Sequence, residues 1–84
     1  MKYITVAIPE KVLLVEKMDE TAFAEQMRML TAIKLFELGR LSSGRAAELA
    51  GVPRIEFLLS LGKHKVFPLE AELSELESTY AQGH

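Results

Sequence analysis

The order of hydrophobic and polar residues changes character along the chain, and it begins with an alternation. In residues 3–8, Ile4, Val6 and Ile8 lie on one side of an extended chain, and Pro9 follows. A period of two with β-branched residues predicts a β-strand that ends at the proline. A single strand cannot satisfy its backbone hydrogen-bonding groups, so we expect it to pair with a second copy of the chain or with a partner.

The next apolar run is ambiguous. Residues 12–15 read Val-Leu-Leu-Val, without a polar position. A run this short fits a second strand, which would make a hairpin, and it fits a short helix equally well. The pattern alone leaves both alternatives open.

The longest helical pattern covers residues 20–38, with Asp19 as the N-cap and Gly39 just after the end. Polar residues recur at every third position. Because a helix has 3.6 residues per turn, this three-residue step drifts around the helix, and the polar residues do not form a single polar side. A helix that is apolar on more than one side must be covered on more than one side, and a dimer is the simplest cover. The residues expected at the dimer interface are Ile4, Val6 and Ile8 of the strand and Met29, Ile33 and Phe36 of the helix.

Residues 42–62 predict two short helices joined by a tight turn. Ser42 or Ser43 can cap the first helix, and Gly51 ends it. Pro53 fits the first position of the second helix, where its missing N–H costs nothing. Two short helices joined by a glycine-containing turn form a helix-turn-helix.

The spacing inside this segment agrees with the close helix crossing that such a unit needs. Ala47 is small where the helices should cross, and Gly51 tolerates the positive φ of the turn. The second helix is expected to run to about Leu61 and stop at Gly62, and Leu61 can fill a core position that Ser60 fills poorly. The other side chains expected to face the core are Ala46, Ala50, Val52 and Phe57.

Composition narrows the classes of protein. The chain has 84 residues, 49% of them hydrophobic, and no cysteine. It is therefore one small domain without disulfides or a thiolate metal site, stabilised by its core or by a partner. With 26% charged residues against this hydrophobic content, the composition excludes a disordered acidic or basic tail protein, and the formal net charge of −2 means that no overall charge drives binding to nucleic acid or an anionic membrane. No apolar run reaches the roughly 20 residues that span a bilayer and no signal peptide is visible, so we expect no membrane partner and a cytoplasmic location.

Charge is distributed unevenly, and this distribution points to DNA. Residues 1–39 carry a net charge of −1, residues 40–65 carry +3, and residues 66–84 carry −4. In a DNA-binding helix-turn-helix the second helix contacts base edges while flanking basic residues contact phosphates. Arg54 is the side chain of the second helix that can make a bidentate contact to guanine. The residues expected to contact DNA are Arg40, Ser43, Arg45, Arg54, Lys63 and Lys65.

The second helix also supports an alternative. Ile55, Leu58 and Leu59 crowd the helix that should contact bases, and they suit a protein contact better. The alternative function is a protein-protein interaction module that has the helix-turn-helix shape without binding DNA.

The C-terminal segment has an acidic amphipathic pattern. After Pro68, leucines and a tyrosine recur at steps of four, three and four, with glutamates between them. Such a helix can dock into a groove of a basic partner, for example a nuclease, or pack back on its own domain. The residues expected to contact the partner are Leu69, Glu72, Leu73, Leu76 and Tyr80.

The sequence favours no catalytic chemistry. His64 and His84 are far apart and have no carboxylates at metal-ligand spacing, while Ser42 and Ser43 are accounted for as caps. Gly39, Gly44, Gly51 and Gly62 lie at or near the ends of predicted helices and form no phosphate-binding loop. We therefore expect no enzyme, no catalytic residue, no metal and no cofactor.

The helix-turn-helix segment resembles a known family. Residues 35–51, Leu-Phe-Glu-Leu-Gly-Arg-Leu-Ser-Ser-Gly-Arg-Ala-Ala-Glu-Leu-Ala-Gly, followed by Phe57-Leu58 and Leu61-Gly62, are similar to small prokaryotic proteins catalogued as uncharacterised. These are regarded as helix-turn-helix antitoxins, often encoded beside toxins that are PIN-type nucleases. The resemblance covers about residues 3–68; Lys65 stands where members commonly have a turn residue. It implies a dimeric antitoxin that represses its own operon.

Together these features predict a mainly α fold with an N-terminal β-strand, a long helix, a helix-turn-helix unit and a C-terminal amphipathic helix. Residues 1–65 would form the dimerising, DNA-binding domain, and residues 66–84 the acidic segment that binds the partner. The expected function is an antitoxin-like transcriptional regulator of a type II toxin-antitoxin system, which binds operator DNA and neutralises a PIN-type nuclease.

Overall fold

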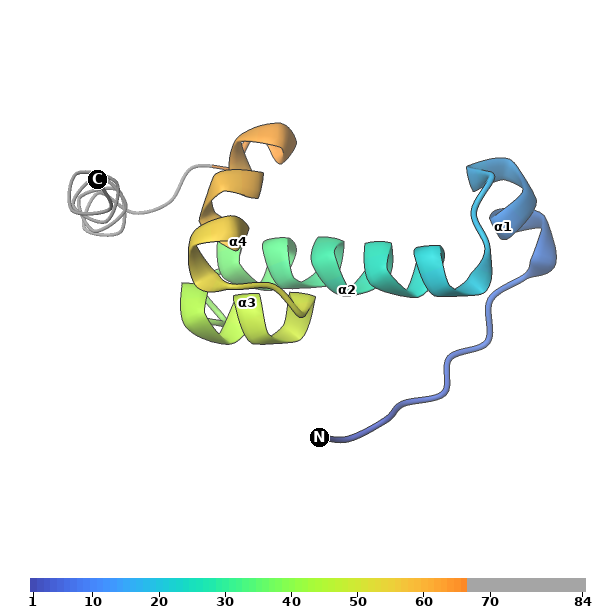
Figure 1. The fold of residues 1–84 in the computed structure, drawn as a ribbon, viewed down its shortest axis with the longest axis horizontal. Helices are drawn as coiled ribbons and strands as arrows, with labels where there is room; N and C mark the ends of the chain where they lie inside the picture. The colour runs from blue at the N-terminus through green and yellow to red at the C-terminus, as the bar shows by residue number, and fades with distance from the viewer. Residues whose placement is uncertain (67–84) are drawn as a thin grey trace.

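The structure, a computed structural model, describes residues 1–66 of the chain, and this part is mainly α-helical, as predicted. A long rod, α2, carries α1 at one end and α3 and α4 at the other (Figure 1). The predicted C-terminal helix, with Leu69, Glu72, Leu73, Leu76 and Tyr80, lies outside the described residues. The elements are α1 (Glu10–Glu16), α2 (Glu20–Glu37), α3 (Ser43–Ala50), α4 (Arg54–Ser60) and the 3₁₀ helix η1 (Leu61–His64).

The predicted N-terminal β-strand is wrong. Residues 1–9 form neither strand nor helix, and they run away from the helices into solvent (Figure 1). Ile4 is 84% exposed and Val6 56% exposed, so neither is covered by the chain. An alternating sequence gives an extended segment two different sides, but a strand also needs a neighbouring strand to pair with its backbone N–H and C=O groups. Residues 1–66 contain no strand that could provide this pairing.

The open alternatives for residues 12–15 are decided in favour of a helix. They lie inside α1, which follows Pro9 and ends where Lys17 adopts the left-handed conformation at φ 57°. The backbone N–H of Met18 donates to the carbonyl of Leu13 at 3.2 Å and closes the last turn. None of the seven residues of α1 is buried.

The predicted ends of the long helix are confirmed within one residue. The carboxylate of Asp19 accepts from the backbone N–H of Ala22 at 2.8 Å, which caps the start of α2. At the other end α2 stops at Glu37, and Gly39 has the left-handed φ of 74° that favours glycine after a helix.

The two short helices and the turn of the predicted helix-turn-helix are also present, with two small shifts in the boundaries of the second helix. The hydroxyl of Ser42 accepts from the backbone N–H of Arg45 at 3.2 Å and caps α3, and Gly51 makes the turn at φ 77°. Pro53 is extended at ψ 150°, so it serves as the N-cap of α4 and not as its first residue. The regular helix ends at Ser60, and η1 continues it.

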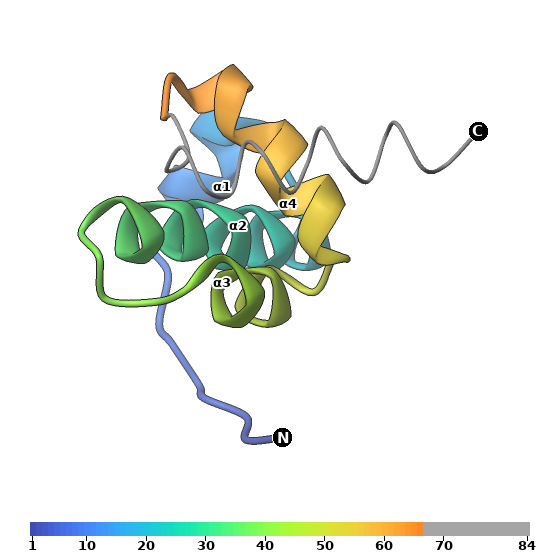
Figure 2. The ribbon, with the colours of Figure 1, turned by 90° about the vertical axis from the view of Figure 1, so that its left-hand side faces the viewer.

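A single core forms where α3 and α4 pack on the C-terminal half of α2. Figure 2 shows α3 and α4 against different sides of that helix. The rings of Phe36 and Phe57 meet edge to face, with centroids 5.7 Å apart, and Phe57 is fully buried. Of the predicted core residues, Ala46 and Phe57 are completely buried, and Leu61 fills the place that Ser60 suits poorly. The partly buried residues packed against this core are Met29, Phe36, Leu41, Leu49, Ala50 and Val52.

Candidate nucleic-acid interface

A side-chain hydrogen bond joins the start of α4 to the start of α3. Arg54 is the first residue of α4, and its Nε donates to the hydroxyl of Ser43 at 2.8 Å. Ser43 is only 2% exposed, so this hydroxyl points into the helix-turn-helix. The structure thus brings together two of the predicted DNA contacts, but it makes Ser43 the support of Arg54.

Arg45 lies on the outer surface of α3 with an acidic neighbour. Its Nη1 is 3.2 Å from the carboxylate of Glu48, one turn further along the same helix. Both side chains are about 70% exposed (71% and 69%), so solvent screens the pair and the arginine can exchange it for a phosphate at little cost.

The other three predicted phosphate contacts flank the unit. Arg40 lies in the connection between α2 and α3, Lys63 lies in η1, and Lys65 follows η1 directly. All three are exposed, and none forms an ion pair with another residue of the described part. Lys65 also ends η1 in the left-handed conformation at φ 55°, where the family resemblance led us to expect a turn residue.

The outward side of α4 differs from the pattern that the sequence suggested. Leu58 is 4% exposed and belongs to the core, so only Ile55, half-buried, and Leu59, 48% exposed, remain as apolar surface on this helix. Glu56 is exposed on the same helix, and sequence reasoning gave it no role. A carboxylate there can accept a hydrogen bond from the amino group of cytosine.

Sequence reasoning also missed a residue that holds the unit on α2. Nε of Arg28 donates to the carbonyl of Leu49 at 2.7 Å, and Nη2 donates to the carbonyl of Glu48 at 3.4 Å. These carbonyls belong to the last turn of α3, where a positive charge is favoured. Arg28 lies in the part of the sequence where the polar positions drift around the helix, and no local signal distinguishes it from a solvated arginine.

The residues predicted for dimerisation fall into two groups. Ile33 is 5% exposed, and Met29 and Phe36 pack against the same core, so this chain covers them itself. Ile4 and Val6 are exposed, and their role in dimerisation stays a prediction. Ile8 is half-buried.

Residues 1–66 hold no cluster of three histidine, aspartate or glutamate side chains that could bind a metal ion. His64 is engaged locally, since its Nδ1 lies 3.2 Å from the carbonyl of Ser60. None of the helices that the structure describes is both long enough and apolar enough to cross a membrane.

The profile of one family, described as the uncharacterised protein family UPF0175, matches residues 1–82. The chain belongs to this family. A UPF0175 protein of Archaeoglobus fulgidus is 38% identical over 60 residues, which are 71% of this chain and 68% of the archaeal protein. No solved structure matches the chain. Because UPF0175 is described as uncharacterised, membership by itself assigns no activity.

Proposed function

We propose that this UPF0175 protein is a DNA-binding transcriptional regulator of the antitoxin type, acting as a dimer. The observation that carries the proposal is the α3–turn–α4 unit, in which two short helices pack together with Ala46 and Ala47 buried and the chain turns at Gly51. This unit stands at one end of α2 (Figure 1), and the exposed cations Arg40, Lys63 and Lys65 flank it. Such units bind DNA by placing the second helix in the major groove.

The support for base contact comes from the start of α4. The N-terminal residues of the second helix of a helix-turn-helix are the ones that meet base edges. Arg54 occupies this position, and the buried hydroxyl of Ser43 holds its Nε. A guanidinium carries five N–H donors in a fixed plane, so a support at one of them orients the group. We therefore assign base contact to Arg54 and positioning to Ser43.

The support for phosphate contact comes from the exposed cations around the unit. Arg40, Lys63 and Lys65 have no acidic partner among the described residues, and Arg45 has only an exposed one. Each phosphate neutralised releases counterions, so binding through these residues should weaken steeply with salt. Few cations per chain bind DNA weakly, which is why two copies acting together are part of the proposal.

The experiment compares Arg54→Ala with Ser43→Ala, using DNA from upstream of the gene and fluorescence anisotropy at several salt concentrations. Both substitutions break the bond between the two helices, but only the first removes the guanidinium. We expect Arg54→Ala to weaken specific binding by about 1–3 kcal/mol and Ser43→Ala to weaken it less. Equal effects of the two variants would show that Arg54 acts only as a structural link. No binding by the wild type at low salt would refute the proposal.

The antitoxin part of the proposal is supported by the sequence of residues 66–84, with its net charge of −4 and its leucine spacing. A nuclease must present a positive surface to its substrate, and an acidic amphipathic segment is complementary to such a surface. The test is to co-express the chain with a PIN-type nuclease encoded beside it. Growth rescue that is lost with Leu73→Asp supports the proposal, and the absence of any complex in co-purification would contradict it.

A second candidate is supported by one observation on α4. Leu59 is 48% exposed next to the half-buried Ile55, and this pair suits a protein contact better than a DNA groove. The candidate is a protein-protein interaction module with the helix-turn-helix shape. Such a module does not bind DNA, so this candidate predicts no DNA affinity of the wild type at low salt. It also predicts that Leu59→Gln weakens the binding of a partner protein, while Arg54→Ala leaves that binding within about twofold.

A further inference from the structure

The short helix α1 has two apolar sides, and the rest of the described chain buries no residue of either. Leu14 is 75% exposed and Val15 is 79% exposed. A helix of seven residues is not stable in water without packing against something else. α1 also has no side-chain cap at its start. Its helical conformation therefore calls for a covering surface.

The sequence of this segment is complementary to a reversed copy of itself. Residues 10–17 read Glu-Lys-Val-Leu-Leu-Val-Glu-Lys. Two copies related by a twofold axis run antiparallel, so the first residue of the segment faces the last of the other copy. Glutamate then faces lysine at both ends, valine faces valine, and leucine faces leucine. No position in this pairing sets like charges together or buries a charge against an apolar side chain.

The helical period divides the eight residues into two sides. Each side by itself is also complementary to the same side of a reversed copy. One side, called here the leucine side, consists of Glu10, Leu13, Leu14 and Lys17. With Met18, Asp19 and Glu20 these residues line an open hollow of about 620 Å³. The opposite side, the valine side, consists of Lys11, Val12, Val15 and Glu16 and lines a smaller hollow of about 250 Å³.

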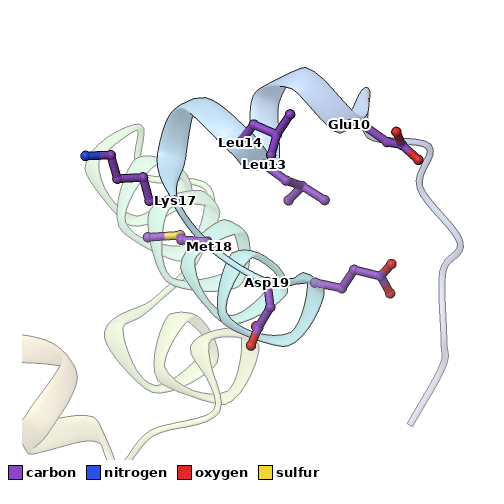
Figure 3. Close-up of a pocket in the computed structure, with 7 residues that line it drawn as sticks. Glu10, Leu13, Leu14, Lys17, Met18 and Asp19 are labelled. Atoms are coloured by element: carbon purple, nitrogen blue, oxygen red, sulfur yellow. The ribbon is translucent and has the colours of Figure 1, made fainter.

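The leucine side is the better docking surface of the two. Leucine offers more apolar area than valine, and Met18 extends the apolar surface toward α2. Figure 3 shows Leu13 and Leu14 between Glu10 at one end of the hollow and Lys17 at the other. A reversed copy seated there sets its leucines on these leucines and its charges on the opposite charges.

We propose that the leucine side of α1 binds the leucine side of a second copy of this chain in an antiparallel helix pair. Leu13 and Leu14 pack across the twofold axis, and each Glu10 faces Lys17 of the partner subunit. α1 lies at the far end of α2 from α3 and α4, so this pairing leaves both helix-turn-helix units uncovered (Figure 1). The proposal does not depend on DNA binding, and its test measures only self-association.

The test is sedimentation equilibrium of the full chain, with charge reversals on the leucine side. Glu10→Lys and Lys17→Glu each set like charges together at both ends of the pair, and each should raise the dimer dissociation constant by about tenfold or more. The double variant restores opposite charges and should return toward the wild-type value. Mixing the two single variants in equal amounts should give a heterodimer that is tighter than either homodimer.

The matched control makes the same charge changes on the valine side of the same helix. Lys11→Glu and Glu16→Lys should leave the dissociation constant within about twofold of the wild type, and circular dichroism reports the helix content of every variant. A monomeric wild type would overturn the proposal. So would valine-side reversals that weaken the dimer more than leucine-side reversals, or a mixture of the single variants that forms no heterodimer. In those cases another occupant, such as a different protein, covers α1.

Discussion

Arg28 connects two helices that are far apart in sequence, and it does so through backbone carbonyls. Its guanidinium donates to the carbonyls of Leu49 and Glu48 at the C-terminal end of α3, where the helix dipole favours a cation. It also approaches the turn closely, since a Cβ added at Gly51 would lie 3.4 Å from its terminal nitrogens. The position of α3 on α2 thus depends on one exposed side chain as well as on the core.

We expect Arg28→Met to lower the free energy of unfolding by about 1 kcal/mol. Methionine keeps the helix propensity and most of the apolar stem, so the loss reports the bonds to α3. Urea denaturation provides the measurement. Lys34→Met is the control, because Lys34 makes only an exposed pair with Glu37 at 2.7 Å and should change stability by less than about 0.5 kcal/mol. Equal losses for both variants would contradict this role for Arg28.

Two glycines of the helix-turn-helix should respond to alanine with opposite signs. Gly51 has a φ of 77° and faces Arg28, so Gly51→Ala should destabilise the protein by about 1 kcal/mol or more. Gly44 lies inside α3 with open space around it, so Gly44→Ala should stabilise the protein by a few tenths of a kcal/mol up to about 1 kcal/mol. Thermal unfolding of both variants under one condition checks the signs. A Gly51→Ala variant as stable as the wild type would argue against this turn.

At the scale of elements, the sequence predicts helix ends well because local side chains determine them. Asp19 and Ser42 bond backbone groups three residues later, and Gly39 and Gly51 take the left-handed conformation after a helix. These interactions span only a few residues, so their chemistry can be recognised without the rest of the fold. The helix-turn-helix follows from the same local rules.

The prediction of an N-terminal strand was wrong because strand formation is not decided by local sequence alone. Ile4 and Val6 have the right pattern, but the described chain offers no second strand to complete the backbone hydrogen bonds.

For the candidate site, the contacts between residues far apart in sequence could not be predicted either. The bonds of Arg28 to α3 and of Arg54 to Ser43 join positions 21 and 11 residues apart. Only the packing of the helices shows which cations are engaged in the fold.

The close approach of α3 to its neighbours should depend on the small size of Ala46. This residue is completely buried, so Ala46→Leu forces the helices apart and should cost about 1–3 kcal/mol. Ala24→Leu makes the same change on an exposed position of α2 and should cost less than about 0.5 kcal/mol. Chemical denaturation of the two variants measures the difference. An Ala46→Leu variant as stable as its control would mean that the crossing is looser than the structure shows.

At the scale of the whole molecule, the two ends of α2 have different properties. The C-terminal end carries the core with α3 and α4, while the N-terminal end carries α1 and an exposed extended segment (Figure 1). Hydrogen exchange should therefore be slow for amides of α3, α4 and the second half of α2. It should be fast for residues 1–9. Protection of α1 should rise with protein concentration if a second copy covers it, and strong protection of residues 1–9 would contradict this description.

The proposed function depends on the α3–turn–α4 unit being the surface that binds DNA. The most direct measurement is a titration of isotope-labelled protein with DNA from upstream of the gene, followed by amide chemical shifts at low salt. We expect the shifts to concentrate in residues 40–65, to be largest around Arg54, and to diminish as salt is added. Shifts confined to α1 and the first half of α2, or no shifts at any salt concentration, would contradict it.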